Sequence, residues 1–177
     1  MHSTEKTNEI AKKIKLLILD IDGVLTDGGI YFDDTGKELK KFNSLDGHGI
    51  NMLLSSGIEV GVITARSTSS VSYRLKDLGV KHYYHGISDK SITLTELTDK
   101  LSIELSQVCY VGDDVIDLTV MTKVALPIAV ANAHSFVKEH SILVSKKCGG
   151  SGAVREVCDF LLKSQGKYDA LMESYLK

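Results

Sequence analysis

Short apolar runs alternate with amphipathic segments along nearly the whole 177-residue chain. Apolar runs bounded by turn residues are typical of buried strands, and the segments between them have helical spacing. The predicted strands are 15–19, 59–63, 82–84, 108–111, 126–130 and 142–144, and the predicted helices are 49–56, 67–78, 88–101, 115–122 and 153–162. This alternation favours an α/β fold with a doubly wound (Rossmann-like), mostly parallel sheet, in a single domain covering residues 1–177.

One stretch, at about 28–43, breaks this alternation. Residues 29–32 and 38–42 have the character of two short strands, and the Asp33-Asp34-Thr35-Gly36 sequence between them is typical of a hairpin turn. This β-hairpin flap follows the first predicted strand, so it should project over the same edge of the sheet. It is too small to form a separate cap domain. A site beneath it would stay open, and a larger cover would have to come from another subunit.

Composition places the chain among ordinary globular proteins, with 43% hydrophobic and 25% charged residues. The net charge of −2 gives no electrostatic reason to expect a nucleic acid or an acidic membrane as partner. No apolar stretch approaches the roughly 20 residues that a membrane helix needs, and the polar start of the chain lacks the apolar core of a secretory signal. The three cysteines show no metal-ligand spacing, which favours free thiols and a cytoplasmic location.

The first predicted strand ends in two carboxylates, Asp20 and Asp22, which are followed by Gly23. Open α/β sheets bind their ligands at the carboxyl ends of the strands. Two aspartates so close repel each other, and a divalent cation with oxygen ligands would relieve that repulsion. Taken alone, the pair is equally consistent with a turn or a helix cap. A calcium loop is disfavoured, because Val24 and Leu25 stand where an EF-hand needs an oxygen ligand and a glycine.

More polar residues of the same chemical kind follow the other predicted strands. They are Thr64, Arg66, Lys90, Asp113, Asp114 and Asp117. Each of them alone has an ordinary explanation as a helix cap, a turn residue or a surface charge. Together they add a second acidic strand end, a hydroxyl and an ammonium at the same edge of the sheet.

This set of groups fits phosphoryl transfer. A carboxylate that attacks phosphorus must approach an anion. Mg²⁺ bridging Asp20 and a phosphate oxygen, with Asp113 as a further ligand, would neutralise the charge between them. Lys90 and Thr64 could hold the remaining phosphoryl oxygens. Asp22 could protonate the leaving alcohol and then activate water against the aspartyl-phosphate.

The chain resembles the haloacid dehalogenase superfamily of phosphotransferases in four motifs, which are Asp20-Ile-Asp22-Gly-Val-Leu-Thr, Thr64, Lys90 and Gly112-Asp113-Asp114-x-x-Asp117. Receiver domains of response regulators also place acids, threonine and lysine on a doubly wound sheet. In those domains the acidic pair, the phosphorylated aspartate, the threonine and the lysine follow in sequence. Here the second acidic cluster comes last, so the order favours the first family.

Residues 14–166 more closely resemble the small, capless 3-deoxy-D-manno-octulosonate 8-phosphate phosphatases. The most specific stretches are Asp46-Gly47-His48-Gly49-Ile50, Val130-Ala131-Asn132-Ala133-His134 and Gly149-Gly150-Ser151-Gly152-Ala153-Val154-Arg155-Glu156. The resemblance implies a magnesium-dependent phosphatase that releases the free sugar acid and phosphate in lipopolysaccharide precursor biosynthesis. It also implies a homotetramer whose subunits cover one another's sites, with a phosphorylated sugar acid as substrate.

Roles for the acidic residues follow from this resemblance. It implies that Asp20 is the nucleophile and a metal ligand, and that Asp22 is the acid/base and a metal ligand through its carbonyl. Asp113 would complete the metal set. Asp114 and Asp117 would support that set.

The resemblance also implies that Thr64 and Lys90 hold the phosphoryl group. The residues implied for substrate contact are Asp22, Asn43, Ser44, Leu45, Asp46, Gly47, Arg66, Arg74 and Lys90. Three positions depart from the family pattern: Asn51 stands for a usual Arg, Ala65 for a usual Gly and Thr119 for a usual Pro. Because these positions lie beside the reacting atoms, they bear on the choice of sugar acid more than on the reaction.

The C-terminal tail, about 166–177, carries apolar side chains at helical spacing. They are Tyr168, Leu171, Met172, Tyr175 and Leu176. Such a helix would either pack on its own domain or dock across a subunit boundary near the open site.

Two other functions remain open from the sequence. One is a phosphatase for a different sugar-acid phosphate, such as an acylneuraminate 9-phosphate. The other is a non-catalytic oligomerisation module, since related domains are fused to sialic-acid-activating enzymes. The intact Asp20, Asp22, Lys90 and Asp113 argue against such a module, because a scaffold has no need of them.

Overall fold

The computed structural model of the protein describes residues 4–177 and contains a six-stranded parallel sheet in the order β5-β4-β1-β6-β7-β8. The strands are β1 (Leu16–Leu19), β4 (Glu59–Ile63), β5 (His82–Tyr84), β6 (Val108–Gly112), β7 (Leu126–Ala129) and β8 (Leu143–Val144). All six lie where the sequence predicts strands, and the doubly wound α/β fold is confirmed. The chain builds β4 and β5 on one side of β1 and β6 to β8 on the other, so the strand order reverses beside β1.

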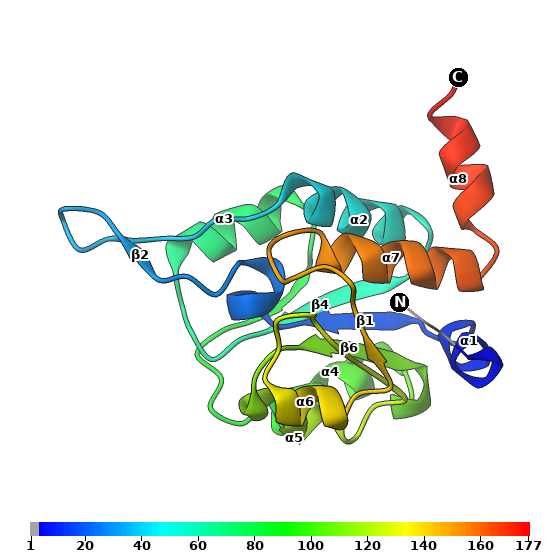
Figure 1. Ribbon diagram of the computed structural model, residues 1–177, viewed down its shortest axis with the longest axis horizontal. Helices are drawn as coiled ribbons and strands as arrows, with labels where there is room; N and C mark the ends of the chain where they lie inside the picture. The colour runs from blue at the N-terminus through cyan, green and yellow to red at the C-terminus, as the bar shows by residue number, and fades with distance from the viewer. Residues whose placement is uncertain (1–3) are drawn as a thin grey trace.

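Helices cover both faces of this sheet (Figure 1). The two longest helices on one face, α2 and α7, pack against each other, and α4, α5 and α6 lie on the opposite face. The helices are α1 (Glu5–Ala11), α2 (Ser44–Ser55), α3 (Ser69–Asp77), α4 (Lys90–Leu101), α5 (Leu118–Met121), α6 (Ser135–Glu139), α7 (Ala153–Ser164) and α8 (Tyr168–Ser174). Within residues 4–177, none of the helices is both long and apolar enough to cross a membrane.

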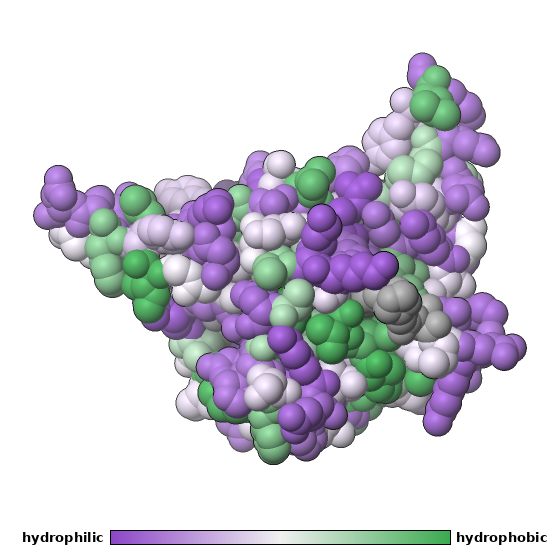
Figure 2. Space-filling view, viewed as in Figure 1, coloured by the Kyte–Doolittle hydropathy of each residue, from purple (hydrophilic) through white to green (hydrophobic). Residues whose placement is uncertain are grey.

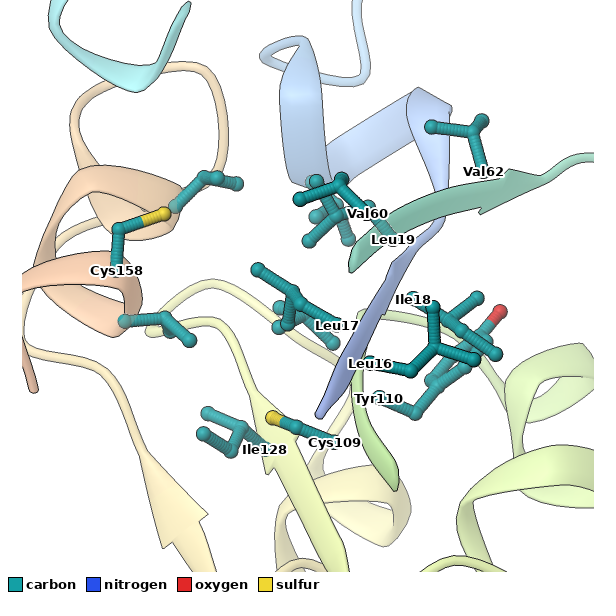
Figure 3. Close-up of a cluster of buried hydrophobic side chains, with 14 of the residues drawn as sticks. Leu16, Leu17, Ile18, Leu19, Val60, Val62, Cys109, Tyr110, Ile128 and Cys158 are labelled. Atoms are coloured by element: carbon teal, nitrogen blue, oxygen red, sulfur yellow. The ribbon is translucent and has the colours of Figure 1, made fainter. Parts of the chain in front are cut away.

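The core is centred on β1, whose four residues are all fully buried (Figure 3). A parallel strand covered by helices on both faces needs apolar side chains at every position, and this explains why the sequence shows a continuous apolar run there. Cys109 and Tyr110 of the neighbouring β6 and Cys158 of α7 belong to the same cluster. In the register, Leu19 lies beside Val62 of β4 and Val111 of β6, so the residues after these strands emerge together at one edge.

Helix α2 begins at Ser44, five residues before the predicted start at residue 49. The prediction is wrong because the glycines of this stretch resemble loop residues, whereas in the fold they permit close packing. A Cβ on Gly47 would lie 2.1 Å from Nη2 of Arg74, and one on Gly49 would lie 3.2 Å from Cα of Arg155. Asn43 caps the helix by accepting a hydrogen bond from the Leu45 amide at 2.8 Å.

The hairpin and the C-terminal helix project from the body of the molecule (Figure 1). The predicted hairpin forms, but its strands are short, β2 (Tyr31–Phe32) and β3 (Glu38–Leu39). Asp33 closes the turn by accepting hydrogen bonds from the Thr35 and Lys37 amides, both at 2.9 Å. Helix α8 buries none of its residues fully, although its first half packs against the core.

Candidate active site

The loop after β1 brings Asp20 and Asp22 to the edge of the sheet where the strand order reverses. Gly23 follows in a left-handed conformation with φ of +86°. A Cβ on Gly23 would lie 2.0 Å from Oδ2 of Asp113, which follows β6. Glycine is therefore required here both for the backbone turn and for the close approach of the two acidic loops.

Lys90, the first residue of α4, lies at the centre of a buried polar network. Its Nζ donates to Oδ1 of Asp20 at 2.7 Å and to Oδ1 of Asp117 at 2.8 Å. The Tyr110 hydroxyl also donates to Oδ1 of Asp117, at 2.6 Å. The other oxygen of Asp117 accepts from the Asp113 amide at 2.9 Å. Asp117 thus fixes both the ammonium and the second acidic loop, and both of its oxygens are occupied.

The carboxylates are more numerous here than the cations that could neutralise them. Burial and the negative charge of Asp117 raise the pKa of Asp20 to about 6, against the lowering effect of Lys90. Burial, followed by the charges of Asp117, Asp20 and Asp114, raises the pKa of Asp113 to about 8. Burial works to lower the pKa of Lys90, but the two carboxylates that it contacts raise it above its ordinary value. The local charge therefore favours the uptake of a proton or a cation.

Three carboxylates could face one cation. Asp20, Asp113 and Asp117 each present an oxygen, and these oxygens lie within 4.8 Å of one another. Both oxygens of Asp117 already accept hydrogen bonds, so Asp20 and Asp113 are the carboxylates left for a cation. Two hard oxygen ligands suit Mg²⁺, which usually takes one or two carboxylates from the protein and fills its other positions with water and phosphate oxygens. Burial and the neighbouring carboxylates raise the pKa values of Asp20 and Asp113, and a bound cation would lower them by stabilising the ionised forms. The residues present fit such an ion.

A cavity of about 240 Å³ opens above these groups. Its lining residues are Asp20, Asp22, Gly28, Thr64, Ala65, Arg66, Asp113, Asp114 and Ile116. The structure thus brings together the acids, the threonine and the arginine that the sequence singles out at the strand ends. Lys90 is not among the lining residues, but its Nζ contacts Asp20, which is.

The predicted substrate residues on α2 and α3 do not line this cavity. Asp46 is buried and accepts from the amides of Gly152 at 3.3 Å and Arg155 at 2.8 Å, so it caps α7. Arg74 lies against Gly47 and donates to Asp77 at 2.8 Å. Of this predicted set, Asn43, Ser44, Leu45, Asp46 and Gly47 form the start of α2. Their contact with substrate stays a prediction.

Sequence reasoning missed three residues that contact the site. Tyr110 contacts Lys90 and Asp117 from within β6, and Lys40 and Glu38 contact Asp22 and Arg66 from the hairpin. Two signals were available. Tyr110 is the one hydroxyl-bearing side chain in an otherwise apolar buried strand, and Glu38 and Lys40 are spaced two apart, which places them on one face of a strand.

Comparisons with known proteins agree with this geometry. The haloacid dehalogenase-like hydrolase family matches residues 84–156. The 3-deoxy-D-manno-octulosonate 8-phosphate phosphatase KdsC of Escherichia coli K12 is 52% identical over 159 residues, which cover 90% of this chain and 85% of that protein.

Two crystal structures superpose closely on the fold. A probable YrbI family phosphatase from Pseudomonas syringae has a TM-score of 0.96 at 44% identity, over 98% of this chain and 99% of that one. The 3-deoxy-D-manno-octulosonate 8-phosphate phosphatase of Moraxella catarrhalis, in complex with magnesium, phosphate and KDO, has a TM-score of 0.95 at 40% identity, with the same coverage. Together with the strand-end acids, these similarities confirm the resemblance seen in the sequence: the chain belongs to the 3-deoxy-D-manno-octulosonate 8-phosphate phosphatase family of haloacid dehalogenase-like hydrolases.

Proposed function

We propose that this protein is a magnesium-dependent phosphoric monoester hydrolase. Its substrate is 3-deoxy-D-manno-octulosonate 8-phosphate, which it converts to the free sugar acid and phosphate in lipopolysaccharide precursor biosynthesis. The observation that carries this proposal is the buried Lys90 ammonium, 2.7 Å from the Asp20 carboxylate at the edge of the sheet where the strand order reverses. The names of the relatives support the substrate.

Asp20 acts as the nucleophile. One of its carboxylate oxygens forms a bond to phosphorus while the ester P–O bond breaks, and Asp22 gives a proton to the leaving sugar oxygen. Asp22 then takes a proton from water, which attacks the phosphorus of the aspartyl-phosphate, releases phosphate and restores Asp20. Lys90 and the buried Thr64 stabilise the charge on the phosphoryl oxygens. Each proton and each bond is accounted for by these four residues.

Asp20, the backbone carbonyl of Asp22 and Asp113 would hold the Mg²⁺, with Asp114 and Asp117 in support. The ion supplies Lewis-acid neutralisation of the charge between nucleophile and phosphate when it is bound. The protein's own contribution is to hold the donors in place. Asp117 does so by accepting hydrogen bonds from the Asp113 amide at 2.9 Å and the Asp114 amide at 3.3 Å.

The substrate's carboxylate and sugar would extend beyond the reacting atoms. Arg66 stands at the mouth of the cavity with a partly exposed side chain and is suited to bind a carboxylate. At about 240 Å³ the cavity is smaller than the roughly 300–1,000 Å³ of typical ligand sites, so this chain alone cannot enclose a phosphorylated eight-carbon acid. Asn43, Ser44, Leu45, Asp46, Gly47 and Arg74 are proposed as further contacts in a site that extends past this cavity.

A homotetramer would supply the missing cover. The hairpin exposes four large apolar side chains, Ile30, Tyr31, Phe32 and Leu39, and Figure 2 shows green patches on the lower side of the projecting arm, behind a purple tip. A two-stranded hairpin is only marginally stable by itself in water, so an exposed apolar hairpin is best stabilised by contact with another surface. The free thiols Cys109, Cys148 and Cys158 are compatible with a cytoplasmic protein, which we propose as well.

The proposal is tested by measuring phosphate release from octulosonate 8-phosphate with Mg²⁺ and with a chelator. Wild type should release phosphate only with the metal, and Asp20→Asn should abolish release. Asp99→Asn, on the exposed face of α4, is the matched control and should behave as wild type. If, within a panel of phosphorylated sugar acids, only acylneuraminate 9-phosphate released phosphate, the proposed substrate would be wrong and that compound would take its place. No release from any phosphoester would contradict the enzyme and favour an oligomerisation module.

A further inference from the structure

Lys40 is a buried cation on an otherwise exposed hairpin. Its side chain is 1% exposed, although the adjacent side chains of Leu39 and Lys41 face solvent. Its Nζ forms a close ion pair with Oδ1 of Asp22 and lies 2.8 Å from Oε1 of Glu38. Burying an ammonium is costly unless it is paired, so these two contacts determine where the side chain rests.

The ion pairs around Lys40 close into a ring of alternating charge. Glu38 Oε2 accepts from Nη2 of Arg66 at 2.9 Å, and Nε of Arg66 lies 3.8 Å from Oδ2 of Asp22. Two members come from the hairpin, and the other two follow β1 and β4 at the edge of the sheet. Glu38 and Lys40 share one face because residues two apart in an extended strand point the same way. Ion pairs therefore connect the base of the hairpin to the site.

We propose that Lys40 is a positioning residue for Asp22, an inference that rests on the proposed function. Asp22 must present one oxygen to the leaving group and later to water, in a fixed direction. The contact with Lys40 occupies Oδ1. Within residues 4–177, Oδ2 has only the 3.8 Å approach of Arg66, so it is the oxygen left to exchange a proton. Lys40 does not touch the reacting atoms and acts through Asp22 alone.

This inference predicts a dependence on the leaving group. An alkyl phosphate such as octulosonate 8-phosphate needs a proton on its leaving oxygen, whereas 4-nitrophenyl phosphate releases a stable phenolate without one. The ratio kcat/KM reports the steps up to release of the first product. A residue that positions the proton donor should thus affect kcat/KM for the alkyl ester and spare it for the aryl ester.

The experiment compares Lys40→Met with Lys41→Met, its exposed neighbour on the same hairpin, on both esters with saturating Mg²⁺. Lys40→Met should lower kcat/KM for octulosonate 8-phosphate at least about tenfold, a part of the roughly 100- to 10,000-fold that general acid–base catalysis contributes. For 4-nitrophenyl phosphate the loss should stay below about threefold, which also shows that the variant is folded. Lys41→Met should match wild type on both.

Two results would overturn the inference. Equal losses on both esters would mean that Lys40 supports the site as a whole and not Asp22, and no loss on either would mean that it has no part in turnover. Both are distinct from failure of the proposed function, in which wild type itself releases no phosphate and the two proposals fall together.

Discussion

The carboxyl edge of the sheet and the two projections of the molecule are built on opposite principles. At the edge, the charged side chains of Asp20, Lys90 and Asp117 are buried against one another and held at 2.7–2.8 Å. On the projections, apolar side chains face solvent: Phe32 of the hairpin is 62% exposed and Leu176 beyond α8 is 87% exposed. Charged side chains are thus buried at the edge of the sheet, and large apolar side chains are exposed on the projections.

This contrast suggests a division between the reacting groups, which a single chain positions, and the apolar projections, for which we propose a role in assembly. The phosphoryl-transfer groups are positioned by β1, β4, β6 and α4, which pack in the core of a single chain. The hairpin and α8 contribute little to that core, and we propose that contact with another subunit covers their exposed apolar side chains. Changes at the edge should therefore affect chemistry, and changes on the projections should affect assembly.

The largest expected effect is at the edge, in Lys90→Met. This change leaves the Asp20 and Asp117 carboxylates facing each other without the ammonium and removes a donor from the phosphoryl site. We expect kcat to fall about 100- to 1,000-fold, the loss found when one preorganised donor is removed from a site. Lys100→Met, at the exposed end of the same helix, is the control. A kcat for Lys90→Met within threefold of wild type would contradict the assignment of the chemistry to the edge of the sheet.

Metal and pH should affect stability through the same edge. Without metal, the folded state keeps protons on Asp20 up to about pH 6 and on Asp113 up to about pH 8, whereas the unfolded chain releases them near pH 3.8. The folded state therefore binds more protons over that interval, and these two groups make the free energy of unfolding fall as pH rises. Asp113→Asn removes one of them.

Thermal unfolding in a chelator measures this. As pH rises from about 5 to about 8, wild type should lose stability relative to Asp113→Asn. Saturating Mg²⁺ should abolish that loss in wild type, because a ligand that binds only the folded state stabilises it. A difference between the two proteins that is the same at all pH values, with and without Mg²⁺, would contradict the raised pKa of Asp113.

On the projections, Phe32→Ser should weaken assembly while leaving the fold of the single chain nearly unchanged. The side chain is 62% exposed, so the stability of the isolated chain should change by no more than about 0.5 kcal/mol. Analytical ultracentrifugation should show a shift to smaller species, whereas Tyr73→Ser, at a still more exposed aromatic residue on α3, should leave the mass unchanged. An unchanged oligomeric mass for Phe32→Ser would contradict a role of the hairpin in assembly.

The smallest effect is expected from truncation after Gly166. Tyr168 lies under the Lys163 ammonium, 4.4 Å from ring centroid to Nζ, and the Tyr175 ring lies 5.5 Å from that of His48, but α8 buries none of its residues fully. The truncated chain should stay folded, with impaired turnover or assembly. Unchanged kinetics together with unchanged oligomeric mass would leave the tail as a helix that only packs on its own chain.

The four central strands, β4, β1, β6 and β7, were predictable from sequence because they are buried on both faces. Each then appears as a continuous apolar run, and the polar residue that follows marks the edge, as Asp20, Thr64 and Asp113 do. The start of α2 was not predictable in this way, since Gly47 and Gly49 resemble loop residues until the packing of Arg74 and Arg155 against them is known.

Contacts between distant segments also could not be predicted from the sequence. Lys90 was singled out for the phosphoryl group, but its second carboxylate partner, Asp117, depends on how α4 packs against α5, which begins at the next residue. Lys40 was missed because its spacing from Glu38 predicts a shared strand face but does not show that this face is buried, whereas that of Lys41 is exposed. Local patterns predict elements and strand ends, whereas pairings across the fold come from packing.

The central claim, that Asp20 carries the phosphoryl group during turnover, is tested most directly by trapping that intermediate. Wild type is mixed with substrate and Mg²⁺ and quenched within one turnover. Borohydride then reduces an acyl-phosphate to the alcohol, and the peptides are sequenced by mass spectrometry. We expect homoserine at position 20, dependent on both substrate and metal. Homoserine at position 22 or 113, or an unmodified Asp20 while phosphate is released, would contradict it.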